Sequence, residues 1–221
     1  MNQSTKQGVS SVLIVDDHPI VVRGVREAID AEADLQVVAT AEDKQEALAH
    51  FSETPPDVTV VDLSLGSGSG LELIAEALSR CPEARVLVFS IHDEQVYAER
   101  ALRAGARGYV CKDSPTAELI GGIRRVLRDE IVLSPAMSQR MLEQSVGGHA
   151  EQGSGVERLS NRELEIFEMI GRGVAPGEMA EKLGISSKTI ETHCGRIKQK
   201  LRIETGRQLI RQATLWVESD G

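Results

Sequence analysis

Short apolar runs alternate with longer amphipathic segments through the first part of the chain. Five runs are rich in β-branched or other apolar residues: 12–15, 35–39, 58–61, 86–89 and 108–111. After each run, apolar side chains recur at helical spacing, over residues 20–31, 45–51, 71–78, 96–104 and 119–127. Continuous apolar strands that alternate with helices are typical of a parallel sheet with helices on both faces. The pattern therefore predicts an α/β domain with a five-stranded parallel sheet.

Residues 157–221 show helical spacing only. Ser160 and Glu163 form a capping-box pattern, and Pro176 is typical of the first turn of the next helix. Gly184 permits a left-handed turn, after which Ser186 or Ser187 would cap a further helix. One apolar stripe of that helix is formed by Ile190, Cys194, Ile197 and Leu201. Two helices joined by a tight glycine turn, the second with one free face, predict a helix-turn-helix within an all-α domain.

The segment between these parts has its own composition. Ser114 and Pro115 predict a cap and a first-turn proline for the last helix of the α/β domain, and Ser134 and Pro135 start a short helix to residue 141. Residues 145–155 are rich in glycine and polar side chains, which predicts a flexible linker. We expect one domain over residues 10–131, a linker helix and linker over 132–156, and a second domain over 157–221.

Charge is divided unevenly between the two domains. Residues 1–133 carry 22 acidic and 13 basic side chains, whereas residues 157–221 carry 10 acidic and 11 basic ones. Residues 182–211 alone contain eight basic and two acidic side chains, although the whole chain has a net charge of −9. A cationic segment in an acidic protein predicts contact with nucleic acid at the second domain.

The amino terminus is polar, and its first apolar run ends after four residues at Asp16 and Asp17. We expect no signal peptide or membrane span, and a cytoplasmic protein. The three cysteines are far apart and lack metal-ligand spacing, which fits neutral thiols in a reducing compartment.

Carboxylates follow two of the predicted strands. Asp16 and Asp17 end the first apolar run, and Asp62 ends the run at residues 58–61. In a doubly wound parallel sheet, the carboxyl ends of the strands form the crevice where ligands bind. Clustered carboxylates repel one another unless a hard cation neutralises them. The first hypothesis is therefore a Mg2+ site around an aspartate.

Further residues make the pattern specific. Val15 to Pro19 read Val-Asp-Asp-His-Pro, Ser90 closes the fourth run, and Gly108, Tyr109 and Lys112 lie at the fifth. With Asp62, these residues resemble the receiver domain of a two-component response regulator. The second domain resembles a LuxR-type helix-turn-helix through Leu-Ser-Asn-Arg-Glu at 159–163, Gly-Ile-Ser at 184–186 and Lys-Thr-Ile-Glu-Thr-His at 188–193. The combination is that of the NarL/FixJ class, which implies a flavodoxin-like (CheY-like) receiver and a four-helix output domain.

The resemblance implies a phosphoacceptor and a metal site. Asp62 would accept a phosphoryl group from a sensor histidine kinase, in aspartyl-phosphate chemistry. Asp17, with Asp16 close behind, would hold Mg2+ (or Mn2+) together with Asp62 and the backbone carbonyl of Ser64. Beyond this Mg-dependent self-phosphorylation and dephosphorylation, we expect no enzyme activity.

The resemblance also implies a switch. Lys112 would pair with a phosphoryl oxygen, Ser90 would hydrogen-bond the phosphoryl group, and Tyr109 would change rotamer as that hydroxyl moves. Taken alone, each residue has a simpler structural explanation. Asp16 and Asp17 are typical of the start of a helix. Lys112 would be a solvated loop residue, Ser90 a hydroxyl at a strand end, and Tyr109 a packed aromatic side chain. His18 and His92, taken as isolated histidines, are more often polar neighbours of such a site than ligands.

Some residues depart from the family pattern. Leu65 and Gly66 replace the usual Met-Pro, and residues 67–70 are glycine-rich, which lowers the order expected of this loop before metal binding. Lys112 is followed by Asp113 in place of proline, so we expect a trans peptide bond there.

The free face of the predicted recognition helix supplies the candidate DNA contacts. These are Ser187, Lys188, Thr189, Glu191, Thr192, Gly195, Arg196 and Gln199. Glu191 would accept from a cytosine amino group, although an ion pair with Lys188 three residues away is the more common role. Gly195 weakens a helix interior, which close approach to DNA would justify. Lys200 lies nearer the buried edge.

We interpret the chain as a phosphorylation-dependent DNA-binding regulator with a histidine kinase, DNA and a second copy as partners. The last helix, over residues 209–217, offers apolar residues for a homodimer, with core packing as the competing explanation. A protein-binding adaptor is the alternative function. A haloacid-type phosphatase is a third class, but Asp62-Leu63-Ser64 lacks the second acid that it needs.

Overall fold

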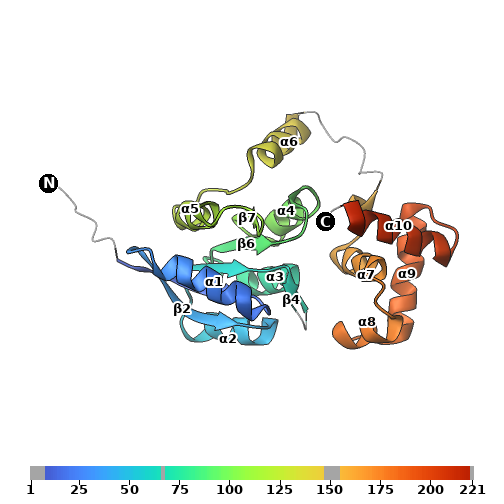
Figure 1. Ribbon diagram of the computed structural model, residues 1–221, viewed down its shortest axis with the longest axis horizontal. Coiled ribbons are helices and arrows are strands. Elements are labelled where there is room, and N and C mark those ends of the chain that lie inside the picture. The colour runs from blue at the N-terminus through green and yellow to red at the C-terminus, as the bar shows by residue number, and fades with distance from the viewer. Residues whose placement is uncertain (1–7, 66–67, 147–154, 220–221) are drawn as a thin grey trace. The chain divides into compact units, whose positions relative to one another are not determined.

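The computed structural model describes residues 8–65, 68–146 and 155–219. The chain divides into two compact units, Met1–Pro135 and Ala136–Gly221 (Figure 1). Most of the predicted flexible linker, residues 147–154, lies outside the described residues. The short helix predicted before it is α6, which runs five residues further than expected and spans Pro135–Val146.

The first unit contains the predicted five-stranded parallel sheet. Its strands are β1 (Ser10–Val15), β2 (Leu35–Ala41), β3 (Val58–Val61), β6 (Val86–Ser90) and β7 (Gly108–Cys111), in the order β2-β1-β3-β6-β7. Every neighbouring pair is parallel. All four residues of β3 and all five of β6 are buried, which explains why these runs are apolar without alternation.

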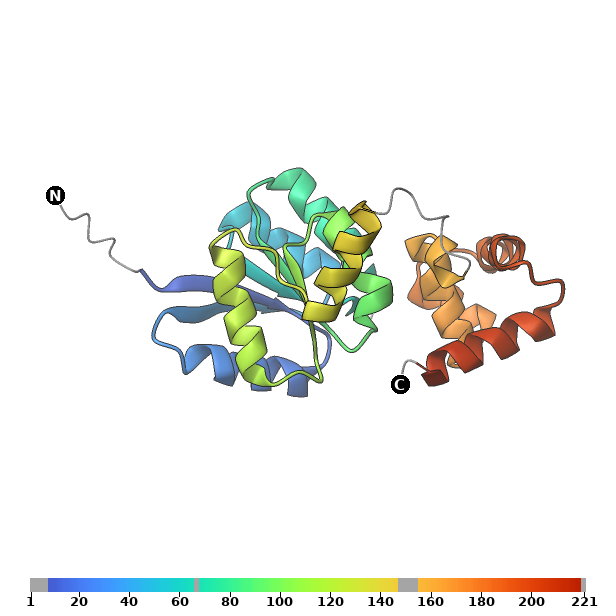
Figure 2. The same ribbon diagram turned by 90° about the horizontal axis from the view of Figure 1, so that it is seen from above.

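Helices cover both faces of this sheet. They are α1 (Pro19–Asp30), α2 (Lys44–Glu53), α3 (Gly70–Arg80), α4 (Glu94–Ala104) and α5 (Thr116–Leu127). α1 contacts α5, and α2 contacts α3, which in turn contacts α4, so the two sets form separate layers (Figure 2). Aspartates cap two of them: Asp43 accepts from the amide of Glu46 and Asp93 from that of Gln95. The predicted start of α5 is wrong by one residue, because Pro115 is extended and is itself the cap of a helix that begins at Thr116.

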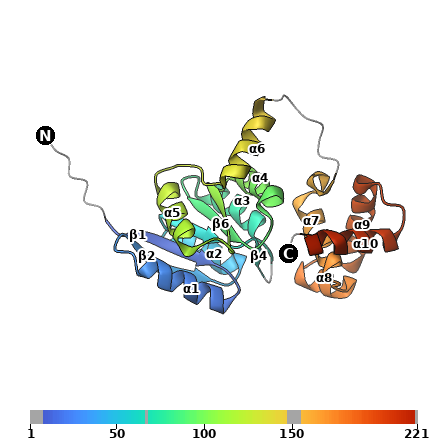
Figure 3. The ribbon, with the colours of Figure 1, turned by 45° about the horizontal axis from the view of Figure 1, so that its top comes forward.

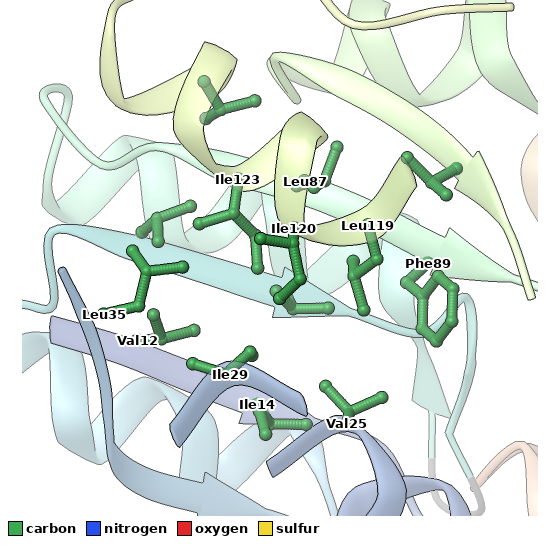
Figure 4. Close-up of a cluster of buried hydrophobic side chains, with 14 of the residues drawn as sticks. Val12, Ile14, Val25, Ile29, Leu35, Leu87, Phe89, Leu119, Ile120 and Ile123 are labelled. Atoms are coloured by element: carbon green, nitrogen blue, oxygen red, sulfur yellow. The ribbon is translucent and has the colours of Figure 1, made fainter. Parts of the chain in front are cut away.

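One apolar core of the first unit lies between the sheet and the α1–α5 layer. Val25 and Ile29 of α1 and Ile123 of α5 point to the same face of the sheet as Ile14 and Leu87 (Figure 4). Ile29 and Ile123 are completely buried. The apolar residues at helical spacing on α1 and α5 thus pack against the buried strand residues in one cluster. This packing holds the strand ends in place.

The loop after β3 differs from the prediction. Part of it forms a two-residue antiparallel pair, β4 (Ser64–Leu65) with β5 (Gly68–Ser69), where we expected only loop. Low order was predicted for the loop because residues 67–70 are glycine-rich. Residues 66–67 lie outside the described residues, whereas Gly68 and Ser69 form β5 and Gly70 begins α3. Gly70 closes the loop by donating its amide to the carbonyl of Leu63 at 2.9 Å. A Cβ at position 70 would lie 2.2 Å from the carbonyl oxygen of Asp62, so only glycine fits here.

The second unit is helical. A 3-10 turn, η1 (Val156–Arg158), precedes α7 (Asn161–Gly171), α8 (Pro176–Lys182), α9 (Ser187–Leu201) and α10 (Gly206–Ser219). α10 packs against α7, and both α7 and α8 contact α9 (Figure 3). The predicted capping box is present, because Ser160 Oγ accepts from the amide of Glu163 and Glu163 Oε2 accepts from the amide of Ser160. Gly184 has the expected left-handed φ of 62°.

The helices in the described parts of the chain are all too short or too polar to cross a bilayer.

Replacing Gly70 with alanine should destabilise the first unit by about 1–3 kcal/mol, because the added methyl group displaces the backbone of Asp62. Gly121→Ala is the matched control. It adds the same methyl group to α5 in open space and should stabilise the unit by about 0.4–1 kcal/mol. Urea unfolding followed by far-ultraviolet circular dichroism measures the difference. The single tryptophan, Trp216 in α10, reports on the second unit, and its fluorescence transition should not move. Equal stability of both variants would contradict the close approach at Gly70.

Candidate functional site

The predicted site residues of the first unit meet at the carboxyl ends of neighbouring strands. β1, β3, β6 and β7 are adjacent in the sheet, and their register places Val15 beside Val61 and Ser90 beside Cys111. The ladder continues past the strands, since Asp62 donates its amide to the carbonyl of Val15 and Lys112 donates to that of Ser90, both at 2.9 Å. The strand ends therefore bring residues from positions 16 to 112 to one edge.

Asp62 is at the centre of this edge and is only 2% exposed. Ser90 Oγ donates to Asp62 Oδ1 at 2.7 Å, and Lys112 Nζ donates to Asp62 Oδ2 at 2.7 Å. Lys112 Nζ also lies 2.6 Å from Asp16 Oδ2. Burial alone would lower the pKa of Lys112, but the negative charges and hydrogen bonds of Asp62 and Asp16 outweigh burial and raise its pKa. Lys112 is thus held as a cation between two carboxylates.

Asp16, Asp17 and Asp62 form an acidic cluster with His18. One potential ligand atom from each lies within 4.8 Å of the others. Asp17 Oδ1 is buried and accepts no hydrogen bond. His18 Nδ1 is 2.8 Å from this oxygen, in ion-pair range, but its hydrogen bond goes to Asp16 Oδ1 instead. A buried carboxylate oxygen without a donor fits a hard cation as its partner. His18 was expected only as a neighbour of the site, and its side chain is 60% exposed.

Ser64 and Tyr109 both contact His92, which was expected as a polar neighbour of the site but without these partners. Ser64 Oγ and His92 Nε2 are 2.6 Å apart, and Tyr109 donates its hydroxyl to the carbonyl of His92 at 2.7 Å. His92 is 8% exposed, and its ring lies 4.7 Å from that of Tyr97 in α4. Tyr109 is buried, which raises its pKa. The only signal in the sequence is the place of His92, two residues after Ser90.

The peptide bond between Lys112 and Asp113 is trans, as expected, since no cis bond occurs among the described residues.

In the second unit, the predicted face of α9 is exposed to solvent. Ser186 caps the helix by accepting from the amide of Thr189, and Ile190 and Ile197 are buried. Cys194 and Leu201, predicted on the same stripe, are only partly buried. Thr189 is half-buried, whereas the other seven predicted DNA contacts are exposed: Ser187, Lys188, Glu191, Thr192, Gly195, Arg196 and Gln199.

Two details of this face differ from expectation or add to it. Among the ion pairs of residues 155–219, none joins Lys188 to Glu191, so the predicted intrahelical pair is not formed. Thr192 Oγ1 donates to the carbonyl of Lys188 at 2.9 Å, which uses its hydroxyl proton within the helix.

Lys200 has a structural contact that fits its place at the buried edge. Its Nζ donates to Glu163 Oε2 at 2.6 Å, and Glu163 is the capping-box residue of α7. Burial alone would raise the pKa of Glu163, but the hydrogen bonds from Lys200 and from the Ser160 backbone lower it. Lys200 therefore ties the end of α9 to the start of α7.

The last helix divides its apolar residues between two faces. Leu209 and Ala213 are buried, and the rings of Trp216 and Phe167 of α7 lie 5.8 Å apart. Ile210 and Leu215 are 57% and 55% exposed. Core packing explains the first group, and the second remains available to a partner.

Comparisons with known proteins agree with this geometry. A model of the response regulator receiver domain matches residues 12–124, and one of the bacterial regulatory proteins of the luxR family matches residues 157–213. The oxygen regulatory protein NreC of Staphylococcus carnosus (strain TM300) is 33% identical over 207 residues, which cover 91% of this chain and 95% of NreC.

The chain belongs to the two-component response regulators with a LuxR-type DNA-binding domain. Solved structures of this family are similar to it. RcsB from Salmonella enterica serovar Typhimurium, bound to promoter rprA in the presence of phosphomimetic BeF3−, has a TM-score of 0.68 and 26% identity over 94% of this chain and 99% of RcsB. A LuxR-family two-component response regulator from Aurantimonas sp. SI85-9A1 has a TM-score of 0.59 and 37% identity over 63% of this chain and 99% of that chain.

Membership in this family identifies the response regulator as a DNA-binding transcription regulator. Its flavodoxin-like receiver and its helical output domain are the fold that the sequence predicted. The LuxR-type domain favours DNA over the adaptor alternative, and the family differs from the phosphatase class.

Lys200→Met should destabilise the second unit of this response regulator by about 1–3 kcal/mol at pH 7, because the buried carboxylate of Glu163 loses its cation. The folded pKa of Glu163 is lowered, so its stabilising contribution is complete above its ordinary pKa of 4.5 and is lost as the pH falls through the folded value. The difference between wild type and variant should therefore shrink below that pH. Urea unfolding followed by Trp216 fluorescence measures it.

Lys188→Met is the matched control for this experiment. It removes an exposed lysine from the same helix and should change stability by less than about 0.5 kcal/mol. If both variants were equally stable at pH 7, the tie between α9 and α7 would contribute nothing.

Proposed function

We propose that Asp62 is the phosphoacceptor and that a sensor histidine kinase supplies the phosphoryl group. The observation that carries this proposal is the pair of contacts on Asp62: Ser90 on one carboxylate oxygen and Lys112 on the other. A phosphoryl group on Asp62 adds acceptor oxygens within reach of a hydroxyl and an ammonium group that already face this side chain. Both partners are fixed by strand ends, so they need little rearrangement to stabilise charge on the transferred group.

Asp17 and Asp62 would hold Mg2+ (or Mn2+), with Asp16 behind them and the backbone carbonyl of Ser64 as a further ligand. The buried Oδ1 of Asp17, which accepts no hydrogen bond, supports this assignment, since carboxylate oxygens are the preferred ligands of hard cations. When bound, such a cation neutralises phosphoryl oxygens during transfer. Lys112 remains at the site as a cation of the protein and pairs with an oxygen of the phosphoryl group.

Phosphorylation would change the receiver through Ser90 and Tyr109. Ser90 leaves the Asp62 carboxylate for a phosphoryl oxygen, and Tyr109 changes rotamer in the space beside it. This shifts an existing equilibrium between an inactive form and one whose output domains pair on DNA. Residues 10–131 act as the receiver, 132–156 as the linker and 157–221 as the DNA-binding domain.

The output domain would bind DNA through α9 as a homodimer. Its exposed side chains contact the major groove, with Lys188 and Arg196 on phosphates or base edges. RcsB was solved bound to promoter rprA, and the present chain has a similar fold and 26% sequence identity to it. Ile210 and Leu215, both exposed on α10, supply the apolar contact between two copies.

Acetyl phosphate should label the wild-type protein only when Mg2+ is present, and it should not label Asp62→Asn, because the amide is not a nucleophile. Asp17→Asn should need a higher Mg2+ concentration for the same labelling. Asp43→Asn is the matched control. It removes a carboxylate from the cap of α2, where asparagine caps equally well, and should label as wild type does. Equal labelling of wild type and Asp62→Asn would remove Asp62 from its role.

Lys188→Ala and Arg196→Ala should each weaken DNA binding without lowering thermal stability, because both side chains are exposed. If the contact is to phosphate, the slope of log affinity against log salt should fall by about 1. Fluorescence anisotropy across a salt series measures this. Arg103→Ala, which removes one exposed cation from α4 of the receiver, should leave the slope unchanged. Wild-type affinity and slope in both α9 variants would show that this helix does not face DNA.

A further inference from the structure

One acidic side chain stands on the face of α9 that is otherwise suited to DNA. Glu191 is exposed, one turn after Lys188 and one turn before Gly195. Phosphates repel a carboxylate, so a negative charge on this face opposes binding unless it makes a specific hydrogen bond. Glu191 forms no ion pair with Lys188 among residues 155–219, although the spacing allows one. The fold therefore leaves its carboxylate available.

Gly195, one turn after Glu191, has no structural reason within the domain to be a glycine. Gly195 has a helical backbone, and a Cβ built there would meet no atom within 4 Å. Glycine weakens a helix interior relative to alanine, and here neither backbone conformation nor packing requires it. Side chains at i and i+4 lie on one helix face, so Gly195 opens space directly beside Glu191.

We propose that Glu191 reads a cytosine in the major groove and that Gly195 allows the helix to approach closely enough for this contact. This inference rests on the proposed DNA-binding function of α9. A carboxylate only accepts hydrogen bonds, and the major groove offers amino donors only on cytosine and adenine. Adenine presents its N7 acceptor beside the amino group, which repels the second carboxylate oxygen, whereas guanine and thymine present acceptors alone. Cytosine is thus the base that suits Glu191.

The neighbouring side chains are less suited than Glu191 to accept a hydrogen bond from cytosine. The hydroxyl proton of Thr192 is donated to the carbonyl of Lys188, so it is not available to a base. Lys188 and Arg196 carry donors only and select acceptors such as phosphate or guanine.

Selection from a pool of random duplexes tests the inference, with the full chain treated with acetyl phosphate and Mg2+. Wild type should enrich a site with a required cytosine and bind that duplex about tenfold more tightly than the three duplexes changed at this base pair. Glu191→Ala should bind all four equally. Glu191→Gln should prefer adenine, because a glutamine amide pairs with its amino group and N7. Both variants should match wild type in the Trp216 unfolding transition.

The outcomes separate this inference from the function on which it rests. If Glu191→Ala and Glu191→Gln keep the wild-type base preference at every position, Glu191 reads no base, and DNA binding itself stands. If wild type enriches no sequence and binds no duplex, the proposed DNA-binding function fails and the inference fails with it.

Gly195→Ala tests the close approach. It should raise the melting temperature of the second unit and weaken binding to the selected duplex several-fold, since its methyl group meets open space in the free protein but DNA in the complex. Gly121→Ala in α5 is the control, with an added methyl group and no effect on binding. Wild-type affinity in Gly195→Ala would overturn the close approach.

Discussion

The ammonium group of Lys112 is the charge that lets two carboxylates, those of Asp16 and Asp62, lie side by side at one edge of the sheet. It contacts Asp62 at 2.7 Å and Asp16 at 2.6 Å, while Asp17 keeps a buried oxygen without a hydrogen bond. Like charges this close repel, and removing one partner of a buried ion pair is strongly unfavourable. Because Ser90 holds the other oxygen of Asp62, any change of charge at this side chain disturbs two strand ends at once.

Contacts lead outward from this centre to the rest of the receiver. His92 hydrogen-bonds Ser64 after β3, accepts from Tyr109 of β7 and packs on Tyr97 of α4. The buried side chain of His92 thus joins the loop after β3 to α4. In the second unit, Lys200 similarly ties α9 to the capping box of α7, which leaves the opposite face of α9 without a structural task.

The five strands were predictable because each is a short apolar run. The cluster was predictable because polar residues follow these runs directly and parallel strands bring their carboxyl ends to one edge. Other features depend on contacts between distant segments. Nothing local announces that His92 would meet Ser64, or that Glu163 would hold Lys200 from 37 positions away. The start of α5 was misplaced because Ser114 and Pro115 form a cap and first-turn pattern in the sequence, whereas Pro115 itself has the non-helical backbone of the cap.

We propose that charge added at Asp62 controls the affinity of the output domain for DNA. The most direct test is the dissociation constant of the full chain for a selected duplex, measured before and after treatment with acetyl phosphate and Mg2+, for wild type and Asp62→Asn. Binding should tighten after treatment in wild type and stay constant in the variant. Equal affinity of the treated and untreated wild-type protein, or tightening in Asp62→Asn as well, would contradict the account.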